Sequence, residues 1–299
     1  MTTTNDQTNE QHDVDEQLIY SAQQYEEEYD NTTPDAIPQI LELDLRGVRV
    51  KLDRDTLVSL PESLLIAMFP NGLVLGRSDP NTVDSEEEEH VGSEDEVLTT
   101  YVDFDSACLE YVLQFYQYAL ETRDEHELQN EGSIFSSSPA AQYYPSLLDK
   151  QPIIVLREEL EYYCVVSKSK ANLSSIKLAS GDYLKVQNKV FAALQKNIAR
   201  ENNVAEQHLI DMLCDAGFTR QDVWGHREVE PNRTCIISMS LVLLQTSGPD
   251  NHMATAQKLL LFWRKPARKC WWDGNTVDIN GESIRLWARR TWTLELALI

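Results

Sequence analysis

Cys270 is the residue whose neighbours most favour covalent chemistry. It follows Arg268 and Lys269, and nearby positive charges stabilise the thiolate form that acts as a nucleophile. A cysteine nucleophile also needs a base, yet the six histidines are scattered and give no His–Cys–acid spacing. Cys270 lies beside Trp271 and Trp272, and a buried or half-buried strand cysteine is the competing interpretation. A reactive Cys270 is therefore a third hypothesis, after two binding functions.

Motifs that hold phosphate or metal are missing from the sequence. The segment from Gly72 to Gly76 lacks the spacing and the Lys-Ser/Thr pair of a phosphate-binding loop. His126-Glu127 has no second histidine at the helical offset used for zinc. The five cysteines are far apart and show no CxxC spacing, which favours reduced thiols in an intracellular protein. The sequence predicts no catalytic residue, no metal, no cofactor and no enzyme activity.

The charge of the chain is strongly asymmetric. The formal net charge is −23, and residues 1–150 contain 33 Asp and Glu against 7 Lys and Arg. Such a segment repels phosphate backbones, so nucleic acid is not an expected partner. The start of the chain lacks the basic and apolar regions of a signal peptide, and no apolar run is long enough to span a membrane. A cytoplasmic protein is predicted, without direct membrane insertion; a partner could recruit it to the plasma membrane, and a nuclear pool stays open.

Three polar segments are predicted to be disordered because they cannot bury enough apolar surface. They are an acidic tail at 1–37 and two inserts at about 71–97 and 121–151. In the first insert, Ser85 and Ser93 precede acidic runs and resemble acidophilic-kinase sites. Phosphorylation there would deepen the negative field, and an unmodified solvated loop is the alternative.

The stretch Leu41–Pro70 shows the clearest local pattern. Apolar and charged residues alternate on both sides of Gly47, which predicts two short strands in a tight hairpin. Ser59-Leu60-Pro61-Glu62 has the form of a capping box that begins a helix. The apolar residues that repeat on one face of this helix are Leu64, Leu65, Met68 and Phe69.

Two further blocks follow in the first half of the chain. Leu98–Asp103 is predicted to be a strand, and Asp105 to be the N-cap of a helix that extends to Leu120. In Ile153–Val166, the side chains of Leu156, Leu160 and Tyr163 share one helical face, which predicts a closing helix.

Together the three blocks resemble the BTB/POZ domains of the potassium-channel tetramerisation (T1) class. The first block contains, in the order typical of that class, Gly47, Thr56-Leu57, Pro61, Ser63-Leu64-Leu65 and Met68-Phe69. One glycine of the family's Asn-Val-Gly-Gly is replaced, because the chain has Asp44-Leu45-Arg46-Gly47. The resemblance implies that residues 38–168 form a split BTB/POZ-like domain, and that several copies self-associate as a homo-oligomer.

Residues 172–299 are predicted to form a separate C-terminal α+β domain. Helices are expected after Asp182 and after Asn203, the second ending at Gly217. Strands are expected at Cys235–Leu244, Lys258–Arg264, Arg268–Trp272 and in two runs within Ser283–Ile299, with turns at Asp273-Gly274 and Asn280-Gly281. Five of the six tryptophans lie beyond residue 260, so a Trp-rich antiparallel sheet is expected. The predicted fold class of the chain is α+β.

The run FWRKPARKCWWDG, followed by IRLWARRTWTLELALI, resembles the C-terminal signature of fungal BTB-domain growth and stress regulators of the whiskey-phenotype type. This resemblance implies a non-enzymatic adaptor or scaffold in stress response and nutrient-dependent growth regulation. Its implied partner is a plasma-membrane phosphatase of the haloacid-dehalogenase type, which the protein activates or localises. The alternative, implied by other T1-type relatives, is a substrate adaptor of a cullin-based ubiquitin ligase.

Two groups of residues are the candidate partner-binding sites. The group that would face a cullin on the BTB-like surface is Leu64, Leu65, Met68, Phe69, Tyr111 and Phe115. The group near the C-terminus is Arg268, Lys269, Trp271 and Trp272. Its basic cluster has three interpretations: a solvated turn, a docking surface for an acidic partner or for the chain's own inserts, or a nuclear-import or nucleic-acid patch.

Overall fold

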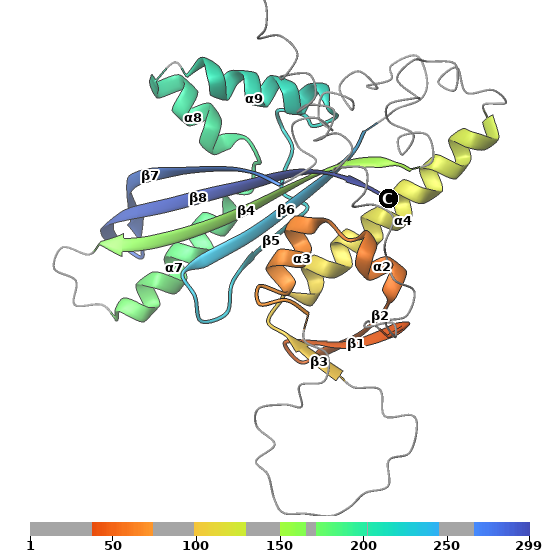
Figure 1. Ribbon diagram of the computed structural model, residues 1–299. Coiled ribbons are helices and arrows are strands. Elements are labelled where there is room, and N and C mark those ends of the chain that lie inside the picture. Colours follow the sequence, from red (N-terminus) through yellow and green to blue (C-terminus); the bar gives the residue numbers. More distant parts are fainter. Residues whose placement is uncertain (1–37, 74–98, 130–149, 166–171, 202, 245–265) are drawn as a thin grey trace, which may run out of the picture. The chain divides into compact units, whose positions relative to one another are not determined.

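The computed structural model describes residues 38–73, 99–129, 150–165, 172–201, 203–244 and 266–299 (Figure 1). Ile40–Ile299 form one compact unit, and every contact below lies within it. Several predictions lie outside the described residues. They are the tail 1–37, most of the insert 71–97, residues 130–149 of the second insert, Ser85, Ser93, and the strand at 258–264.

The first elements are a three-stranded sheet in the order β2-β1-β3. β1 (Ile40–Leu45) pairs antiparallel with β2 (Val48–Asp53) and parallel with β3 (Thr99–Val102). Arg46 and Gly47 form the turn of the hairpin with φ values of 55° and 94°, as a two-residue turn between twisted strands requires. The predicted hairpin and the predicted strand before Asp103 are confirmed.

Three helices follow these strands. α2 is Arg54–Ser59, α3 is Glu62–Met68 and α4 is Ser106–Gln129. Asp105 caps α4 as predicted, because its Oδ1 accepts a hydrogen bond from the Ala107 amide at 2.8 Å. α4 runs further than predicted, so residues 121–129 of the second insert are helical.

The predicted capping box at Ser59–Glu62 is wrong. Ser59 ends α2, and its hydroxyl donates to the Thr56 carbonyl at 2.8 Å. Pro61 precedes α3 and provides no side-chain cap. The acceptor for the first amides of α3 comes from Glu295, more than 230 residues away, which no local pattern could indicate.

The predicted closing helix at Ile153–Val166 is also wrong, because Pro152–Val165 is a strand, β4. Leu156 and Leu160 are four residues apart, so they share a face in a helix and in a strand alike. The deciding feature is pairing on both sides, with β6 and with β8. The end of the range predicted for the first domain thus lies in the sheet predicted for the second.

β4 is the central strand of a five-stranded sheet in the order β5-β6-β4-β8-β7, antiparallel throughout. The other strands are β5 (His226–Val229), β6 (Cys235–Leu243), β7 (Ala267–Ile279) and β8 (Glu282–Leu298). The two runs predicted within 283–299 are one strand. The predicted turn at Asn280-Gly281 is confirmed, with φ values of 55° and 80°. The α+β class and the antiparallel sheet rich in tryptophan are confirmed.

The predicted turn at Asp273-Gly274 is wrong, because both residues lie inside β7. Gly274 pairs with Trp287 of β8. A Cβ at Gly274 would lie 2.7 Å from the Trp287 ring, so the glycine serves close packing within the strand rather than a turn.

Three helices cover one face of the large sheet. They are α7 (Leu173–Val186), α8 (Ala192–Glu201) and α9 (Val204–Asp215). The prediction that Asp182 caps a helix is wrong, since Asn172 caps α7 and Asp182 lies within it. The predicted Asn203 cap of α9 is confirmed: its Oδ1 accepts from two backbone amides.

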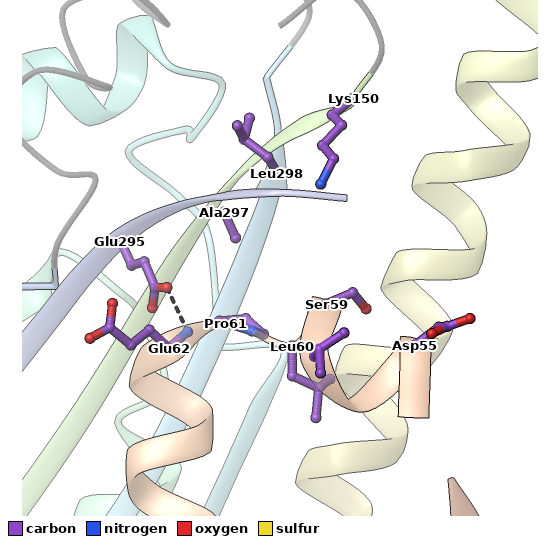
Figure 2. A pocket seen from close by; sticks show the side chains of 10 residues that line it. Asp55, Ser59, Leu60, Pro61, Glu62, Lys150, Glu295, Ala297 and Leu298 are labelled. Atoms are coloured by element: carbon purple, nitrogen blue, oxygen red, sulfur yellow. Dashed lines mark hydrogen bonds between the residues drawn. The ribbon is translucent and has the colours of Figure 1, made fainter. Parts of the chain in front are cut away.

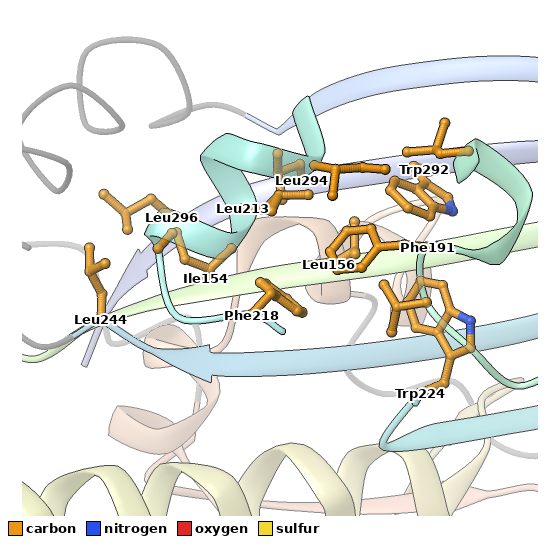
Figure 3. Close-up of a cluster of buried hydrophobic side chains, with 14 residues drawn as sticks. Ile154, Leu156, Phe191, Leu213, Phe218, Trp224, Leu244, Trp292, Leu294 and Leu296 are labelled. Carbon is orange, nitrogen blue, oxygen red and sulfur yellow. The ribbon is translucent and has the colours of Figure 1, made fainter. Parts of the chain in front are cut away.

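The main core lies between these helices and the sheet (Figure 3). Trp292 of β8 is at its centre, with ring centroids 6.3 Å from Phe191, 6.0 Å from Trp224 and 5.4 Å from Trp271. Such edge-to-face contacts add to the free energy gained by burying the rings. Leucines and isoleucines of β4, β8 and α9 complete the cluster.

The opposite face of the sheet is covered at one end by α3 and α4 (Figure 1). Glu295 of β8 reaches the first amides of α3, and the Tyr111 hydroxyl of α4 accepts from the Leu241 amide of β6 at 3.2 Å. The first half of the chain is thereby joined to the large sheet by direct hydrogen bonds.

Glu158 of β4 is a buried charge between two parts of the core, with an exposed fraction of 1%. Its carboxylate accepts from Arg227 at 2.6 Å, Arg290 at 2.8 Å and the Trp292 indole at 3.0 Å. Burial by itself would raise the pKa of Glu158, but the charges and hydrogen bonds of Arg290 and Arg227 lower it overall. The cluster therefore ties β4, β5 and β8 together with paired charges.

Replacing Glu158 with glutamine should destabilise the protein by about 3 to 5 kcal/mol, because two buried arginines lose their counter-charge. Urea unfolding followed by circular dichroism measures the change. The matched control is Glu228→Gln, which removes a half-exposed partner of Lys185 and should cost less than about 1 kcal/mol.

The pH dependence provides a second readout for Glu158→Gln. Because folding lowers the pKa of Glu158, its ionised form stabilises the folded state above the unfolded pKa, and this contribution is lost as the pH falls through the folded value. The difference in unfolding free energy between the two proteins should shrink as the pH drops below the ordinary value of 4.5. A difference that stays constant from neutral to acid pH would contradict an ionised Glu158.

Candidate functional site

A pocket of about 390 Å³ opens between the α2–α3 turn and the carboxyl-terminal end of β8 (Figure 2). Leu60, Pro61 and Leu298 give it apolar walls, while Lys150 and Glu295 supply opposite charges. Its volume is at the lower end of the range for ligand pockets. The elements that form it are far apart in sequence and meet because α3 packs on β8.

Two polar side chains of this pocket, those of Glu295 and Ser59, are engaged in hydrogen bonds that hold the fold. Glu295 is 4% exposed, and its two oxygens accept from the Glu62 amide at 2.7 Å and the Ser63 amide at 2.9 Å. The Ser59 hydroxyl donates to a backbone carbonyl. The described lining contains no histidine or cysteine. The pocket can receive a polar group of a partner, but it offers no nucleophile–base pair.

The first predicted group of binding residues is only partly on the surface. Leu64 and Met68 have exposed fractions of 0% and 3%, and they hold α3 in the core. Leu65 and Phe69 are half-buried. The apolar side chain that α3 presents to solvent is Ile66, which is 46% exposed.

The predicted residues on α4 have different environments. Tyr111 lies against β6, and burial raises the pKa of its hydroxyl. Phe115 is half-buried and packs edge-on against Tyr118 at 6.0 Å. Tyr118 and Leu120 are 55% and 39% exposed, so the outer surface of α4 carries apolar side chains near the predicted ones.

The C-terminal group is divided between the two faces of the sheet. Trp271 packs on Trp292 in the core, and Lys269 forms an ion pair with Glu206 of α9 at 3.1 Å. Arg268 and Trp272 point to the other face, and Trp272 is 52% exposed. The strand alternation therefore separates residues that are adjacent in sequence.

The five cysteines form no disulfide. Burial raises the pKa of Cys108 and of Cys235 to about 12, which keeps these thiols protonated and unreactive. Cys270 is exposed on β7, opposite Thr291 of β8. It is a strand cysteine, as the competing interpretation held, but it is not buried.

The described residues lack two features that would indicate other classes of site. In the part of the chain that the structure describes, no three His, Cys, Asp or Glu residues come together in a group that could hold a metal ion. No described helix is both long and apolar enough to cross a membrane.

Comparison with known proteins identifies relatives of this chain. No family model matches the chain. A Whi2-like protein of Schizosaccharomyces pombe is 36% identical over 279 residues, which cover 88% of this chain and 88% of the relative. The growth regulation protein of Saccharomyces cerevisiae is 29% identical over 278 residues, covering 74% of this chain and 56% of the relative. Another S. pombe protein is 24% identical over 88% of both chains.

The structure defines an α+β protein with an antiparallel sheet and a cluster of aromatic residues in its core. The similarity to the first S. pombe protein extends over most of both chains. The chain belongs to the Whi2-like family.

Truncating Glu295 to alanine should destabilise the protein by about 1 to 3 kcal/mol, because two amides at the start of α3 lose their acceptor. Unfolding in urea measures the loss, and amide hydrogen exchange at Ser63 should accelerate. Glu62→Ala is the control, since its exposed side chain lies at the same pocket. Equal effects of the two substitutions would show that Glu295 does not cap the helix.

Proposed function

We propose that the protein is a non-enzymatic adaptor in growth regulation and stress response that binds a plasma-membrane phosphatase and activates or localises it. The growth-regulation part is supported by membership of the Whi2-like family and by the relative named as a growth regulation protein. The phosphatase is supported by the resemblance of the C-terminal run FWRKPARKCWWDG to the signature of the fungal stress regulators.

The main structural support for the adaptor proposal is the exposure of large aromatic side chains. Tyr101, Tyr118, Tyr163 and Trp272 are each between 47% and 59% exposed, and they lie on four different elements. Exposed aromatic residues are common at the centres of protein–protein interfaces. Their distribution favours a protein that contacts partners through more than one surface.

We also propose that Ile40–Gln129 form a BTB/POZ-like assembly module. The hairpin, the helical segment that follows it, the third strand and α4 occur in the order that the resemblance implies. The closing helix of that resemblance is not part of the module, because Pro152–Val165 is a strand of the large sheet. Self-association is a consequence of this proposal, and light scattering of the full chain tests it.

The adaptor proposal predicts that the tagged full chain, purified from stressed yeast cells, carries a haloacid-dehalogenase-type phosphatase with it. Phosphatase activity and mass spectrometry of the eluate measure this. Tyr118→Ala and Trp272→Ala report which aromatic surface the phosphatase uses, and Leu178→Ala on the exposed side of α7 is the matched control. Recovery of no phosphatase from any preparation would overturn the proposal.

A second candidate function is a substrate adaptor of a cullin-based ubiquitin ligase. It is favoured by the apolar outer surface of α4, where Tyr118 and Leu120 are exposed beside Phe115. Tyr118→Ala with Leu120→Ala should weaken binding of a purified cullin N-terminal domain by about tenfold or more. The full chain is the sample, because a fragment ending at residue 168 would separate β4 from its neighbours. Failure of the wild-type chain to bind would remove this function.

A further inference from the structure

An aromatic and basic surface lies on the large sheet, beyond the region covered by α3 and α4. We define it as the aromatic–arginine patch, formed by Tyr163 of β4, Arg285 and Trp287 of β8, and Arg268 and Trp272 of β7. Strand register places all five on one face, since Tyr163 pairs with Trp287, and residues an even number of positions apart in a strand share a face.

The aromatic rings of the patch are arranged by packing within the sheet. Tyr163 and Trp272 are 5.9 Å apart with an interplanar angle of 32°, and they are 47% and 52% exposed. Trp287 fits over Gly274, where a Cβ would be 2.7 Å from its ring. The rings of Tyr163, Trp272 and Trp287 therefore form an aromatic surface that is open to solvent on one side.

Of the arginines Arg268, Arg285 and Arg289, only Arg289 forms an ion pair among the described residues. Arg289, between the rings, is paired with Glu161 at 2.6 Å, and Glu161 also accepts from the Tyr163 hydroxyl at 3.2 Å. Arg285 lies over Trp287 with 5.0 Å between its Cζ and the ring centroid. Among the described residues, Arg285 and Arg268 form no ion pair. The carboxylate of Glu161 is thus bound within this surface, and the guanidinium groups of Arg268 and Arg285 are available to a partner.

Spacing relates the two free arginines to each other. Arg268 of β7 pairs with Thr293 of β8. Thr293 lies eight positions beyond Arg285 on the same strand. At 3.3 Å per residue, the distance is roughly 26 Å. An extended peptide of about eight residues covers that length, with its middle over the rings.

We infer that the aromatic–arginine patch binds an extended acidic segment of a partner protein, with carboxylates near Arg268 and Arg285 and apolar side chains on Tyr163 and Trp272. This inference rests on the proposed adaptor function and specifies the chemistry of the partner. Guanidinium groups bind carboxylates through paired hydrogen bonds, and the geometry of Glu161 on Arg289 shows that the surface accepts them. A polyphosphate chain is disfavoured, because it carries a charge on every unit, while the patch offers one arginine at each end and aromatic rings between them.

Titration of the full chain with a dye-labelled peptide tests the inference. The probe has Glu-Asp pairs at both ends of a Val-Leu-Val-Leu middle, and fluorescence anisotropy reports binding. Two further probes are the same peptide with Gln and Asn ends, and a single-stranded oligodeoxynucleotide. The acidic peptide should bind at least about tenfold more tightly than either, and added salt should weaken it.

Variants locate the binding site on the protein. Arg285→Glu and Trp272→Ala should each weaken the acidic peptide by about tenfold. The matched controls are Arg49→Glu on β2, with a 72% exposed side chain, and Tyr183→Ala on α7, 39% exposed; both should bind like the wild type. Circular dichroism confirms that each variant is folded.

The outcomes separate this inference from the adaptor proposal. Equal binding of acidic and neutral peptides, or equal losses in the patch and control variants, would overturn the inference. Tighter binding of the oligonucleotide would reassign the patch to phosphate. If a phosphatase still co-purifies with Arg285→Glu as with the wild type, the adaptor proposal stands and the patch is not its contact. If the peptide binds as expected but no phosphatase is recovered, the patch stands and the partner was wrongly proposed.

Discussion

The pairing of β4 with its two neighbours is the constraint on which the rest of the structure depends. Residues 152–165 align with 285–298 over the whole length of β4, and with β6 on the other side. This places the middle of the chain against its end and brings Glu158 beside Arg290 and Arg227. A shift of one residue would turn every core side chain of β4 to the wrong face and leave those charges unpaired.

The register also gives the two faces of the sheet different roles. One face is covered by α8 and α9, which bury Trp292 and the leucines around it, and by α7, which packs on Leu160 and Leu286. The other face is used at one end, where Glu295 caps α3 and forms a wall of the pocket. Beyond that end the same face exposes rings and arginines. A single sheet thus supports the core, joins the first half of the chain, and exposes the aromatic–arginine patch.

Membership of the Whi2-like family supports a role in growth regulation, and the exposed aromatic side chains support the binding function proposed above. The exposed surfaces are separate: the outer side of α4 carries Tyr118 and Leu120, and the aromatic–arginine patch lies on the large sheet. An adaptor needs at least two such surfaces, since it holds one protein relative to another. Their different chemistry, apolar on α4 and cationic on the sheet, would let each select a different partner.

The sequence by itself determined the features that depend on neighbours in the chain. Gly47 and Gly281 predicted hairpins, Asn203 and Asp105 predicted helix caps, and the tryptophans predicted the sheet. Tertiary structure decided whatever depends on distant residues. Leu156 and Leu160 fit a helix or a strand until β6 and β8 paired with them, and Gly274 resembled a turn until Trp287 packed on it. The sequence predicts Arg268 and Trp272 as partner-binding residues, but only cross-strand register brings Tyr163, more than 100 positions earlier, to the same surface.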